Sequence, residues 1–447
     1  MQLKLYKTKR MKHILILSIA VVVTLISCKR KEQANQTTII KDENIGIESD
    51  ARGVAEYEPM EAIWLLWPNL NHKKDLPNSS ITLQLINAIA PYAKVNLLVP
   101  NDSVFAFVRH QLPDSLTNTL RLEVIKIPYQ EFWARDMGPL FTMKADGSLQ
   151  IADFNFNAWS YGSTSDPMII KDEKLDENVA NFLKIPKRSS DMIHEGGDHE
   201  LNSKGTLICV ESVERLRNPL MTLAQMETEF KHLLGAKKVI WLKSGVREDD
   251  NTAKGTLVDE FGKTYYTLLT TNGHIDEFCR WVNDSTVLLA EMDKREFKNP
   301  IDRENARRME VNHKILRNST DQDGRPLHII RMPMPKLVYA TMKPGDGVYD
   351  IISEIQYEDK TKFPKEKTVN VIAAASYLNF LIVNDLVIAQ KYWKEGMDSK
   401  IKANDDAAVA VLQKVFPNKK IMTIDAMPVN LGGGGVHCIT MNQPKMK

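Results

Sequence analysis

Residues 431–440 read LGGGGVHCIT, which places Cys438 beside four consecutive glycines close to the end of the chain. A run of glycines removes side chains, so backbone N–H groups can approach a bound ligand closely. A thiolate is the best nucleophile among the common side chains, so a cysteine at such a bare backbone is a candidate nucleophile. The alternative is a flexible terminal loop with an incidental thiol. A phosphate-binding loop is disfavoured, because the spacing matches neither GxGxxG nor GxxxxGK.

The size and composition of the chain are those of a globular protein. Its 447 residues suffice for one large domain or for two or three ordinary ones. The composition is 43% hydrophobic and 26% charged, and a formal net charge of +2 gives no indication of a nucleic-acid partner. The four cysteines include no CxxC pair. We therefore expect neither a disulfide framework nor a thiolate zinc site.

The N-terminal residues 1–27 are predicted to be an export signal. Lys9, Arg10 and Lys12 precede an apolar or hydroxyl run over 14–26, which is short for a bilayer span but suits a signal peptide. The run ends in LISC at 25–28, which resembles the bacterial lipobox. This pattern predicts a lipoprotein signal peptide with Cys28 as the lipidated residue, and a short transmembrane anchor is the alternative.

Either interpretation places the protein at a membrane of a bacterial cell envelope. Met11 is an alternative start to Met1 and would give a signal of ordinary length. Residues 28–52 are polar with few large apolar groups, and we expect them to form a disordered tether. The catalytic domain is then predicted over 53–447.

Helix-and-strand units recur along this domain, and each ends in a loop that carries polar or glycine residues. Strands are predicted over 95–99, 121–127, 206–210, 238–242, 265–269, 287–290, 327–331, 369–374 and 420–424. Helices are predicted over 80–93, 104–112, 221–234, 303–316 and 405–416. The notable loop residues are Asp136, Glu195, His274, Asn379 and Cys438, roughly one per unit. This recurrence predicts about five related modules around one centre, with an ordinary mixed α/β domain as the alternative.

A nucleophilic Cys438 needs a group that lowers its pKa and a group that protonates the leaving group. His274, in the compact sequence NGHID, is a candidate for both tasks. With period-2 alternation, His274 and Asp276 would point to the same side. Glu195, in the sequence EGGD, is a carboxylate that could orient the imidazole. Each residue alone fits a structural role equally well, so the prediction rests on their joint occurrence in loops of matching position.

Two further carboxylates, Asp136 and Asp276, indicate a cationic substrate. A guanidinium group is planar and has five N–H donors in a fixed fork that matches carboxylates. Trp133 could lie against its flat face and supply a cation–π contact. A guanidinium held in this way leaves its central carbon open to a thiolate.

A metal site is the chemical alternative, because residues 194–199 read HEGGDH and are rich in ligand types. The zincin spacing HExxH requires a helix that brings both histidines to one face. Gly196 and Gly197 interrupt such a helix. We therefore predict no metal site.

Taken together, these motifs resemble the agmatine deiminase and bacterial (Porphyromonas-type) peptidylarginine deiminase family of the guanidine-modifying pentein superfamily. The resemblance covers residues 54–443. It rests on AEYEPMEAIWLLWP (55–68), FWARDMGP (132–139), HEGGD (194–198), NGHID (272–276), ASYLN (375–379) and GGGGVHCIT (432–440). It implies an α/β fold, a five-bladed α/β propeller of ββαβ modules with pseudo-five-fold symmetry around a polar pocket.

The resemblance also implies the roles of individual residues. Cys438 looks like the family nucleophile and His274 like its acid–base group. Asp136 and Asp276 look like the clamp for the guanidinium, and Glu195 like the carboxylate that supports the histidine. The remaining implied pocket residues are Trp133 and Asn379. No cofactor and no metal are implied.

The implied reaction is hydrolytic deimination through a covalent amidino-cysteine. The first expected substrate is agmatine, which would give N-carbamoylputrescine and ammonia. The alternative is peptidyl-arginine, which an envelope location favours, and a third hypothesis is a non-catalytic lipoprotein that binds a cationic ligand. The expected partners are therefore a small guanidine or peptidyl-arginine, and a membrane through the lipid anchor. Homo-oligomerisation stays open.

Three features depart from the family pattern. Asn272 precedes Gly-His where agmatine deiminases usually show Thr-Asp-Gly-His, and Gly435 stands where their GGGNIHC tail has asparagine. A lipoprotein-like start is unusual for an enzyme of the polyamine pathway, which is normally cytosolic. These departures affect the prediction of the substrate more than the prediction of the reaction type.

Overall fold

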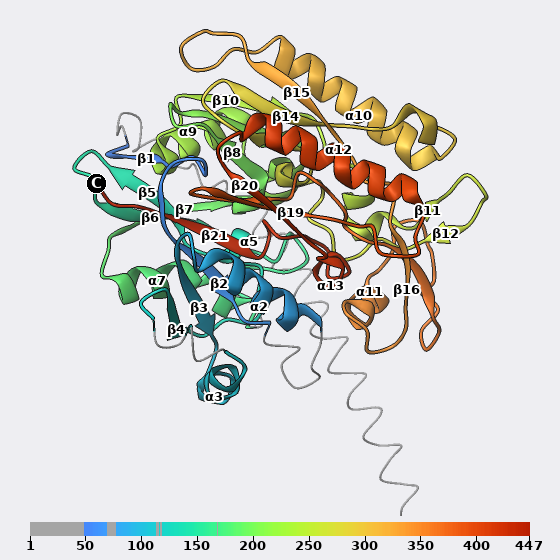
Figure 1. The fold of residues 1–447 in the computed structure, drawn as a ribbon, viewed down its shortest axis with the longest axis horizontal. Helices are drawn as coiled ribbons and strands as arrows, with labels where there is room; N and C mark the ends of the chain where they lie inside the picture. Colours follow the sequence, from blue (N-terminus) through green and yellow to red (C-terminus); the bar gives the residue numbers. More distant parts are fainter. Residues whose placement is uncertain (1–48, 69–76, 113–115, 117–118, 168) are drawn as a thin grey trace, which may run out of the picture. The chain divides into compact units, whose positions relative to one another are not determined.

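The computed structural model describes residues 49–68, 77–112, 116, 119–167 and 169–447 (Figure 1). The chain divides after Ile47, and every described residue belongs to the unit Glu48–Lys447. The predicted signal peptide, Cys28 and nearly all of the predicted tether lie outside the described residues. Ala51 and Arg52, which the sequence analysis assigned to the tether, instead belong to strand β1 (Ala51–Gly53), which pairs with strand β5. No helix in the described ranges combines the length and the apolar character that a membrane span requires.

Four sheets share one connection pattern, in which an antiparallel pair of strands is followed by a helix and by a third strand parallel to the second. The first two sets are β5 (Leu140–Lys144), β6 (Leu149–Asn155), α7 (Leu175–Leu183) and β7 (Lys187–Ile193); then β8 (His199–Leu201), β9 (Thr206–Val210), α9 (Leu223–Leu234) and β10 (Lys238–Leu242). The other two are β13 (Cys279–Trp281), β14 (Thr286–Glu291), α10 (Pro300–Arg317) and β15 (His328–Pro333); then β18 (Leu381–Val383), β19 (Leu386–Gln390), α12 (Ser399–Val415) and β20 (Lys420–Ile424). Each set is a ββαβ module.

A fifth module joins the two ends of the domain. Its strands and helix are β21 (Thr440–Pro444), β2 (Met60–Leu66), α2 (Pro77–Ile89) and β3 (Lys94–Val99). β21 pairs antiparallel with β2, and β2 pairs parallel with β3, so the pattern is that of the other four modules. Figure 1 shows β21, in red, beside β2, in blue. These five modules confirm the predicted α/β propeller of the pentein type, and the C-terminal strand completes it.

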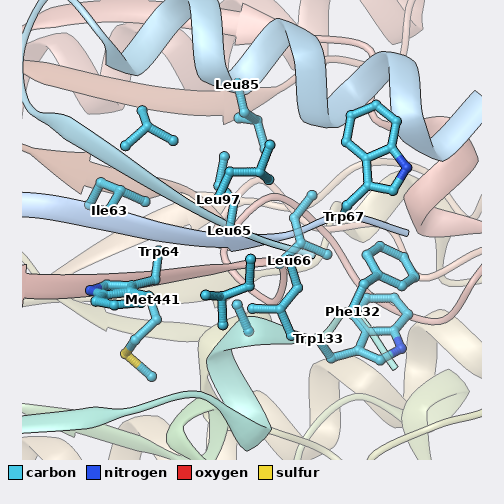
Figure 2. Packing of buried hydrophobic residues seen from close by; sticks show 14 of the residues in the cluster. Ile63, Trp64, Leu65, Leu66, Trp67, Leu85, Leu97, Phe132, Trp133 and Met441 are labelled. Atoms are coloured by element: carbon cyan, nitrogen blue, oxygen red, sulfur yellow. The ribbon is translucent and has the colours of Figure 1, made fainter. Parts of the chain in front are cut away.

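The packing of the core explains why the motif AEYEPMEAIWLLWP (55–68), which contains β2, is so apolar. Every residue from 62 to 67 is buried, because β2 is covered on both faces. Leu85 of α2 and Leu97 of β3 lie on one side of β2, and Trp133 lies on the other (Figure 2). A strand buried on both faces needs a continuous apolar run rather than an alternating one. This packing fixes the segment that carries Trp133 against the central strand.

Two insertions lie between modules. β11 (Leu257–Val258) pairs with β12 (Thr264–Tyr265), and β16 (Tyr339–Met342) pairs with β17 (Val369–Ile372). The two small sheets touch through a bridge between Tyr266 and Val371. The predicted strand over 265–269 is wrong in extent, since only its first residue belongs to β12. Among the described residues, the remaining strand and α-helices are β4 (Leu122–Lys126), α3 (Asp102–Gln111), α5 (Ala134–Met137), α6 (Ile170–Glu173), α8 (Glu211–Arg217), α11 (Tyr349–Glu354) and α13 (Met427–Asn430).

Candidate active site

The residues predicted from the sequence occupy one recurring position in the fold. Asp136, Glu195, Asn379 and Cys438 each stand two to four residues before the first strand of a module, at β5, β8, β18 and β21 respectively. In the remaining module, His274 stands five residues before β13 and Asp276 stands three residues before it. Because the modules repeat one topology, these loops meet at the same end of the propeller. Cys438 and Asp276 line one buried pocket together with His274. Asp136, Glu195 and Asn379 are not among its lining residues, but each lies beside one of them: Asp136 and Glu195 beside His274, and Asn379 beside Cys438.

The thiol of Cys438 lies among amide and acidic groups. Its Sγ is 3.1 Å from Asn379 Nδ2, 3.7 Å from Asp276 Oδ2 and 3.8 Å from Glu277 Oε1. Burial raises the pKa of the Cys438 thiol well above its usual range, and the charges of Asp276, Glu277 and Asp136 raise it further. The thiol is therefore neutral at physiological pH until a cation enters the pocket.

His274 lies between two carboxylates. Its Nε2 is 3.2 Å from Glu195 Oε2, and its Nδ1 is 3.6 Å from Asp136 Oδ1. Burial alone would lower the pKa of His274, but the charge of Asp136 and the hydrogen bond and charge of Glu195 outweigh it and raise the pKa to about 10. His274 is thus an imidazolium at physiological pH, poised to give up a proton.

Glu195 is held by a buried arginine on α8. Arg217 Nε donates to both carboxylate oxygens of Glu195, at 2.7 and 3.0 Å, and its Nη2 donates to the Thr271 carbonyl at 2.8 Å. Burial alone would raise the pKa of Glu195, but Arg217 and His274 together lower it to about 2. Glu195 therefore carries a permanent negative charge that orients the imidazolium of His274.

Asp136 is fixed by two donors. Trp159 Nε1 donates to its Oδ2 at 2.8 Å, and the backbone N–H of Gly197 donates to its Oδ1 at 3.1 Å. Burial raises the pKa of Asp136 to about 6, and the charge of His274 limits the rise. A β-carbon on Gly197 would lie 2.7 Å from Asp136 Oδ1 and 2.5 Å from His274 Nδ1. The second glycine of EGGD is therefore required for these two side chains to meet.

Asp276 has one occupied oxygen and one unoccupied oxygen. Its Oδ2 is 2.7 Å from His437 Nδ1, whereas its Oδ1 has no hydrogen-bond partner among the described residues. Burial would raise the pKa of Asp276, but the hydrogen bond and charge of His437 lower it below its usual value. An ionised carboxylate with a free oxygen in a pocket can accept N–H bonds from a cationic ligand.

The indole of Trp133 lies against the glycine run beside the thiol. A β-carbon on Gly434 would lie 2.6 Å from Trp133 Cζ3 and 3.0 Å from Cys438 Sγ. The ring also packs on Phe132, with the ring centroids 4.7 Å apart. The structure thus brings Trp133 close to the thiol, whereas its contact with the face of a guanidinium stays a prediction. Gly434 is bare because the indole and the sulfur fill the space of its side chain.

The pocket contains acidic residues that the sequence analysis did not select. Glu277, Glu248 and Asp249 line it together with His274, Asp276 and Cys438. The remaining lining residues are Val246, Leu268, Thr270, Thr271, Ile372, Ala374, Ala375 and Gly433, several of which come from the two insertions. Glu277 follows Asp276 directly, so its position immediately after the motif NGHID (272–276) was a signal that could have identified it. Glu248 lies in no motif of the sequence analysis.

The ligand-rich stretch 194–199 is divided between two hydrogen-bond networks. His194 Nδ1 is 2.7 Å from Glu214 Oε1, and its Nε2 is 2.8 Å from His199 Nδ1. These are hydrogen-bond separations. Glu195, in contrast, faces Arg217 and His274 on the pocket side. The side chains of this stretch therefore do not converge on one point as zincin ligands do.

Gly435, where the family tail has asparagine, is accommodated by its neighbours. A β-carbon at this position would lie 2.4 Å from Asn379 Oδ1 and 2.6 Å from Gln390 Nε2. Asn379 in turn donates to Cys438 Sγ and to Glu277 Oε1, the latter at 2.9 Å. The side-chain amides of Asn379 and Gln390 thus occupy the space that an asparagine side chain would need.

We expect Gly435→Asn to displace Asn379 and to lower kcat by about tenfold or more, with a loss of about 1–3 kcal/mol in the free energy of unfolding from overpacking. Gly262→Asn is the matched control, because no atom lies within 4 Å of its β-carbon position. Asparagine also tolerates the positive φ of 80° found at Gly262. Steady-state kinetics and chemical denaturation of both variants check this. Equal effects at the two positions would contradict the packing described here.

Comparison with known proteins shows what the whole chain is similar to. The model of the Porphyromonas-type peptidyl-arginine deiminase family matches residues 52–444. The agmatine deiminase of Pseudomonas aeruginosa (strain LESB58) is 30% identical over 399 residues, which cover 87% of this chain and 94% of the relative. The agmatine deiminase of Medicago truncatula is 30% identical over 409 residues, with 87% and 95% covered.

Solved structures share the fold. The agmatine deiminase of Enterococcus faecalis superposes with a TM-score of 0.67 at 24% identity and covers 89% of this chain and 96% of its own. An agmatine deiminase of C. jejuni with substrate bound superposes with a TM-score of 0.63 at 21% identity, covering 89% and 97%.

Proposed function

Because the chain belongs to the Porphyromonas-type peptidyl-arginine deiminase family and is a hydrolase of C–N bonds in amidines, we propose that it deiminates agmatine through a covalent adduct on Cys438. The observation that carries this proposal is the convergence of a thiol, an imidazolium and free carboxylate oxygen in one buried pocket. Each of these groups corresponds to one requirement of guanidine hydrolysis: a nucleophile, a proton donor and a clamp for the cation.

In the proposed first half-reaction, the guanidinium lies between Asp136 and Asp276. Its positive charge replaces the missing counter-ion of the acidic pocket and lowers the pKa of the Cys438 thiol, so a proton leaves as substrate binds. The thiolate then attacks the central carbon. The tetrahedral adduct collapses as His274 gives its proton to the departing nitrogen, which leaves as ammonia. Holding the carbon at the sulfur can contribute about 7 kcal/mol or more to the rate.

In the second half-reaction, His274 is neutral and accepts a proton from water. The resulting hydroxide attacks the amidino carbon of the adduct. As the C–S bond breaks, the proton of the new hydroxyl group passes to the departing sulfur, which releases the neutral ureido product and restores the Cys438 thiol. Glu195 stabilises the imidazolium each time it forms, as the third member of a catalytic triad does. The proton released when the substrate binds converts ammonia to ammonium, so the sum is guanidinium plus water giving a urea and ammonium.

These protonation states predict how activity depends on pH. Cys438 must lose a proton, and its pKa is raised well above the usual range; Asp136 must also be ionised, and its pKa is about 6. We therefore expect kcat/KM to rise about tenfold per pH unit across the neutral range, and more steeply below about pH 6. It should fall above about pH 10, where His274 loses its proton.

The pH profile of kcat/KM over this range checks the prediction. A profile that is flat between about pH 7 and about pH 9 would mean that the thiol is already ionised in the free enzyme. That outcome would contradict deprotonation driven by substrate.

Agmatine is favoured as the substrate because the pocket holds acidic groups beyond the guanidinium clamp. Glu248 lines the same pocket, and its Oε2 accepts a hydrogen bond from Asn305 Nδ2 at 2.7 Å. Burial raises the pKa of Glu248, because it disfavours the charged carboxylate. A cation bound beside Glu248 would stabilise that charged form. Agmatine carries a second positive charge on its amine, whereas the side chain of peptidyl-arginine does not.

We expect Glu248→Gln to raise KM for agmatine by about tenfold or more, because a charge-assisted hydrogen bond contributes about 1.5–3 kcal/mol. Butylguanidine, which lacks the amine, is the matched control substrate, and its KM should change little. Steady-state kinetics of the variant with both compounds measure the difference. An equal change for the two substrates would remove Glu248 as the amine site.

The proposal as a whole is tested by ammonia release from agmatine, free arginine and an arginine-containing peptide. We expect turnover of agmatine to exceed that of the other two. Faster turnover of the peptide would favour a peptidyl-arginine deiminase, and no turnover of any guanidine would favour a cation-binding protein. An envelope location through Cys28 is a proposal from the motif at 25–28 alone, which lies outside the described residues.

A further inference from the structure

His437 precedes the nucleophile and has no part in the reaction steps above. It is 1% exposed and lies between the pocket and a cluster of buried charges. Its Nδ1 is 2.7 Å from Asp276 Oδ2, and its Nε2 is 2.6 Å from Glu56 Oε1. Both ring nitrogens therefore face carboxylate oxygens.

Both of these carboxylates are ionised. Arg135 Nη1 is 2.6 Å from Glu56 Oε1, and Arg280 Nη2 is 2.7 Å from Glu56 Oε2. Burial would raise the pKa of Glu56, but the charges of Arg135, His437 and Arg280 hold it well below its usual range. The pKa of Asp276 is lowered as well. Ionised carboxylates only accept hydrogen bonds, so the two short contacts place a donor on each ring nitrogen of His437.

The backbone of His437 connects the same residue to the nucleophile. Its N–H donates to Asn379 Oδ1 at 2.9 Å, and its peptide continues directly into Cys438. Asn379 Nδ2 is the group 3.1 Å from the sulfur. The backbone of His437 thus holds the side-chain amide of Asn379 beside the thiol. The side chain of His437 contacts the carboxylate of Asp276, which belongs to the proposed guanidinium clamp.

We propose that His437 is a positioning residue whose imidazolium holds Asp276 Oδ2, so that the other oxygen, Oδ1, is presented to the guanidinium of the substrate. This inference rests on the proposed function, since it assigns a task within guanidine binding. Asp276 Oδ1 is the oxygen left without a partner among the described residues, although Asp276 is fully buried. A buried carboxylate oxygen without a donor is costly unless a ligand supplies one. The imidazolium therefore selects which oxygen the substrate meets.

Two conservative variants separate this task from a general structural one. Asparagine places its amide nitrogen near the position of Nδ1, and glutamine places its amide nitrogen near that of Nε2. His437→Asn therefore keeps the donor to Asp276 and loses the one to Glu56, whereas His437→Gln does the reverse. We expect His437→Gln to raise KM for agmatine by about 10–100-fold, a typical effect of removing a supporting hydrogen bond, while His437→Asn stays within a few-fold of wild type.

The same pair in a Cys438→Ser background measures binding without turnover. Calorimetric titration with agmatine should show the Kd raised in His437→Gln and nearly restored in His437→Asn. Thermal unfolding of both variants is the control for structure. KM and Kd values that follow the unfolding temperature, and not the retained donor, would overturn the inference.

Wild-type protein gives an independent test that does not depend on how the variants fold. With selectively 15N-labelled histidine, NMR should show both ring nitrogens of His437 protonated at neutral pH, assigned by comparison with His437→Asn or a second His437 variant. A neutral ring would overturn the inference. Wild-type protein that turns over no guanidine would instead reject the proposed function, so the two failures are distinguishable.

Discussion

Cys438→Ser is expected to lower kcat for agmatine by about ten-thousand-fold or more, a loss typical of removing a catalytic nucleophile. A serine hydroxyl in the same place has a far higher pKa than a thiol, and the acidic groups around the sulfur raise it further. Binding should survive, because the clamp carboxylates and Trp133 do not depend on the sulfur. Steady-state kinetics give the loss of kcat, and calorimetry gives a Kd within a few-fold of the wild-type KM.

Cys279→Ala is the matched control for this variant. Cys279 is also a free, fully buried cysteine, but it lies in β13 within a hydrophobic cluster and does not line the pocket. Its replacement should reduce stability modestly and leave kcat near the wild-type value. A Cys438→Ser variant as active as Cys279→Ala would remove the proposed nucleophile.

His274→Gln is expected to lower kcat by about a thousand-fold, within the range of general acid–base catalysis. Glutamine can keep a donor toward Glu195 but cannot give up or accept a proton near neutral pH. The buried Arg217–Glu195 pair is untouched, so we expect the variant to fold. Because the leaving nitrogen is then not protonated, the first half-reaction should be slowed in single-turnover measurements.

The control is His328→Gln, an exposed histidine on β15 that does not line the pocket. Its kinetics should match those of wild type. A kcat for His274→Gln within tenfold of the control would show that another group transfers the proton.

The sequence was sufficient to predict which loops of the fold come together, because the module repeats a local pattern. Strands β9, β10 and β20 have the predicted bounds, and α9 ends at Leu234, as predicted, with Gly235 at a φ of 60° after it. Loops that follow such units must meet at one end of a propeller, whatever their individual sequences. The notable polar residue of each loop could therefore be predicted without knowing which residues distant in sequence contact one another.

Strands β5, β6 and β7 could not be predicted, because their sequences lack a clear apolar periodicity. The hairpin of β5 and β6 was not predicted, because its apolar runs are short and fit either strand or helix. β7 (Lys187–Ile193) reads KRSSDMI and is largely exposed, so it shows no apolar alternation. Its place in the sheet is set by pairing with β6, which is a property of the fold.

The supporting residues of the site were missed for a different reason. Arg217, Trp159 and Glu56 reach their partners across 22, 23 and 381 positions of sequence respectively. Spacing patterns do not report contacts of that kind. The departure at Gly435, in contrast, has a local explanation that only coordinates provide, since Asn379 and Gln390 fill the space beside it.

Covalent catalysis by Cys438 is the central claim, and intact-protein mass spectrometry of acid-quenched turnover tests it most directly. With agmatine in excess, we expect a fraction of the protein to gain the mass of the substrate less ammonia, and peptide mapping to place the gain on Cys438. The adduct should be absent from Cys438→Ser and present in Cys279→Ala. Rapid release of ammonia with no adduct at any quench time, or an adduct on another residue, would contradict the account.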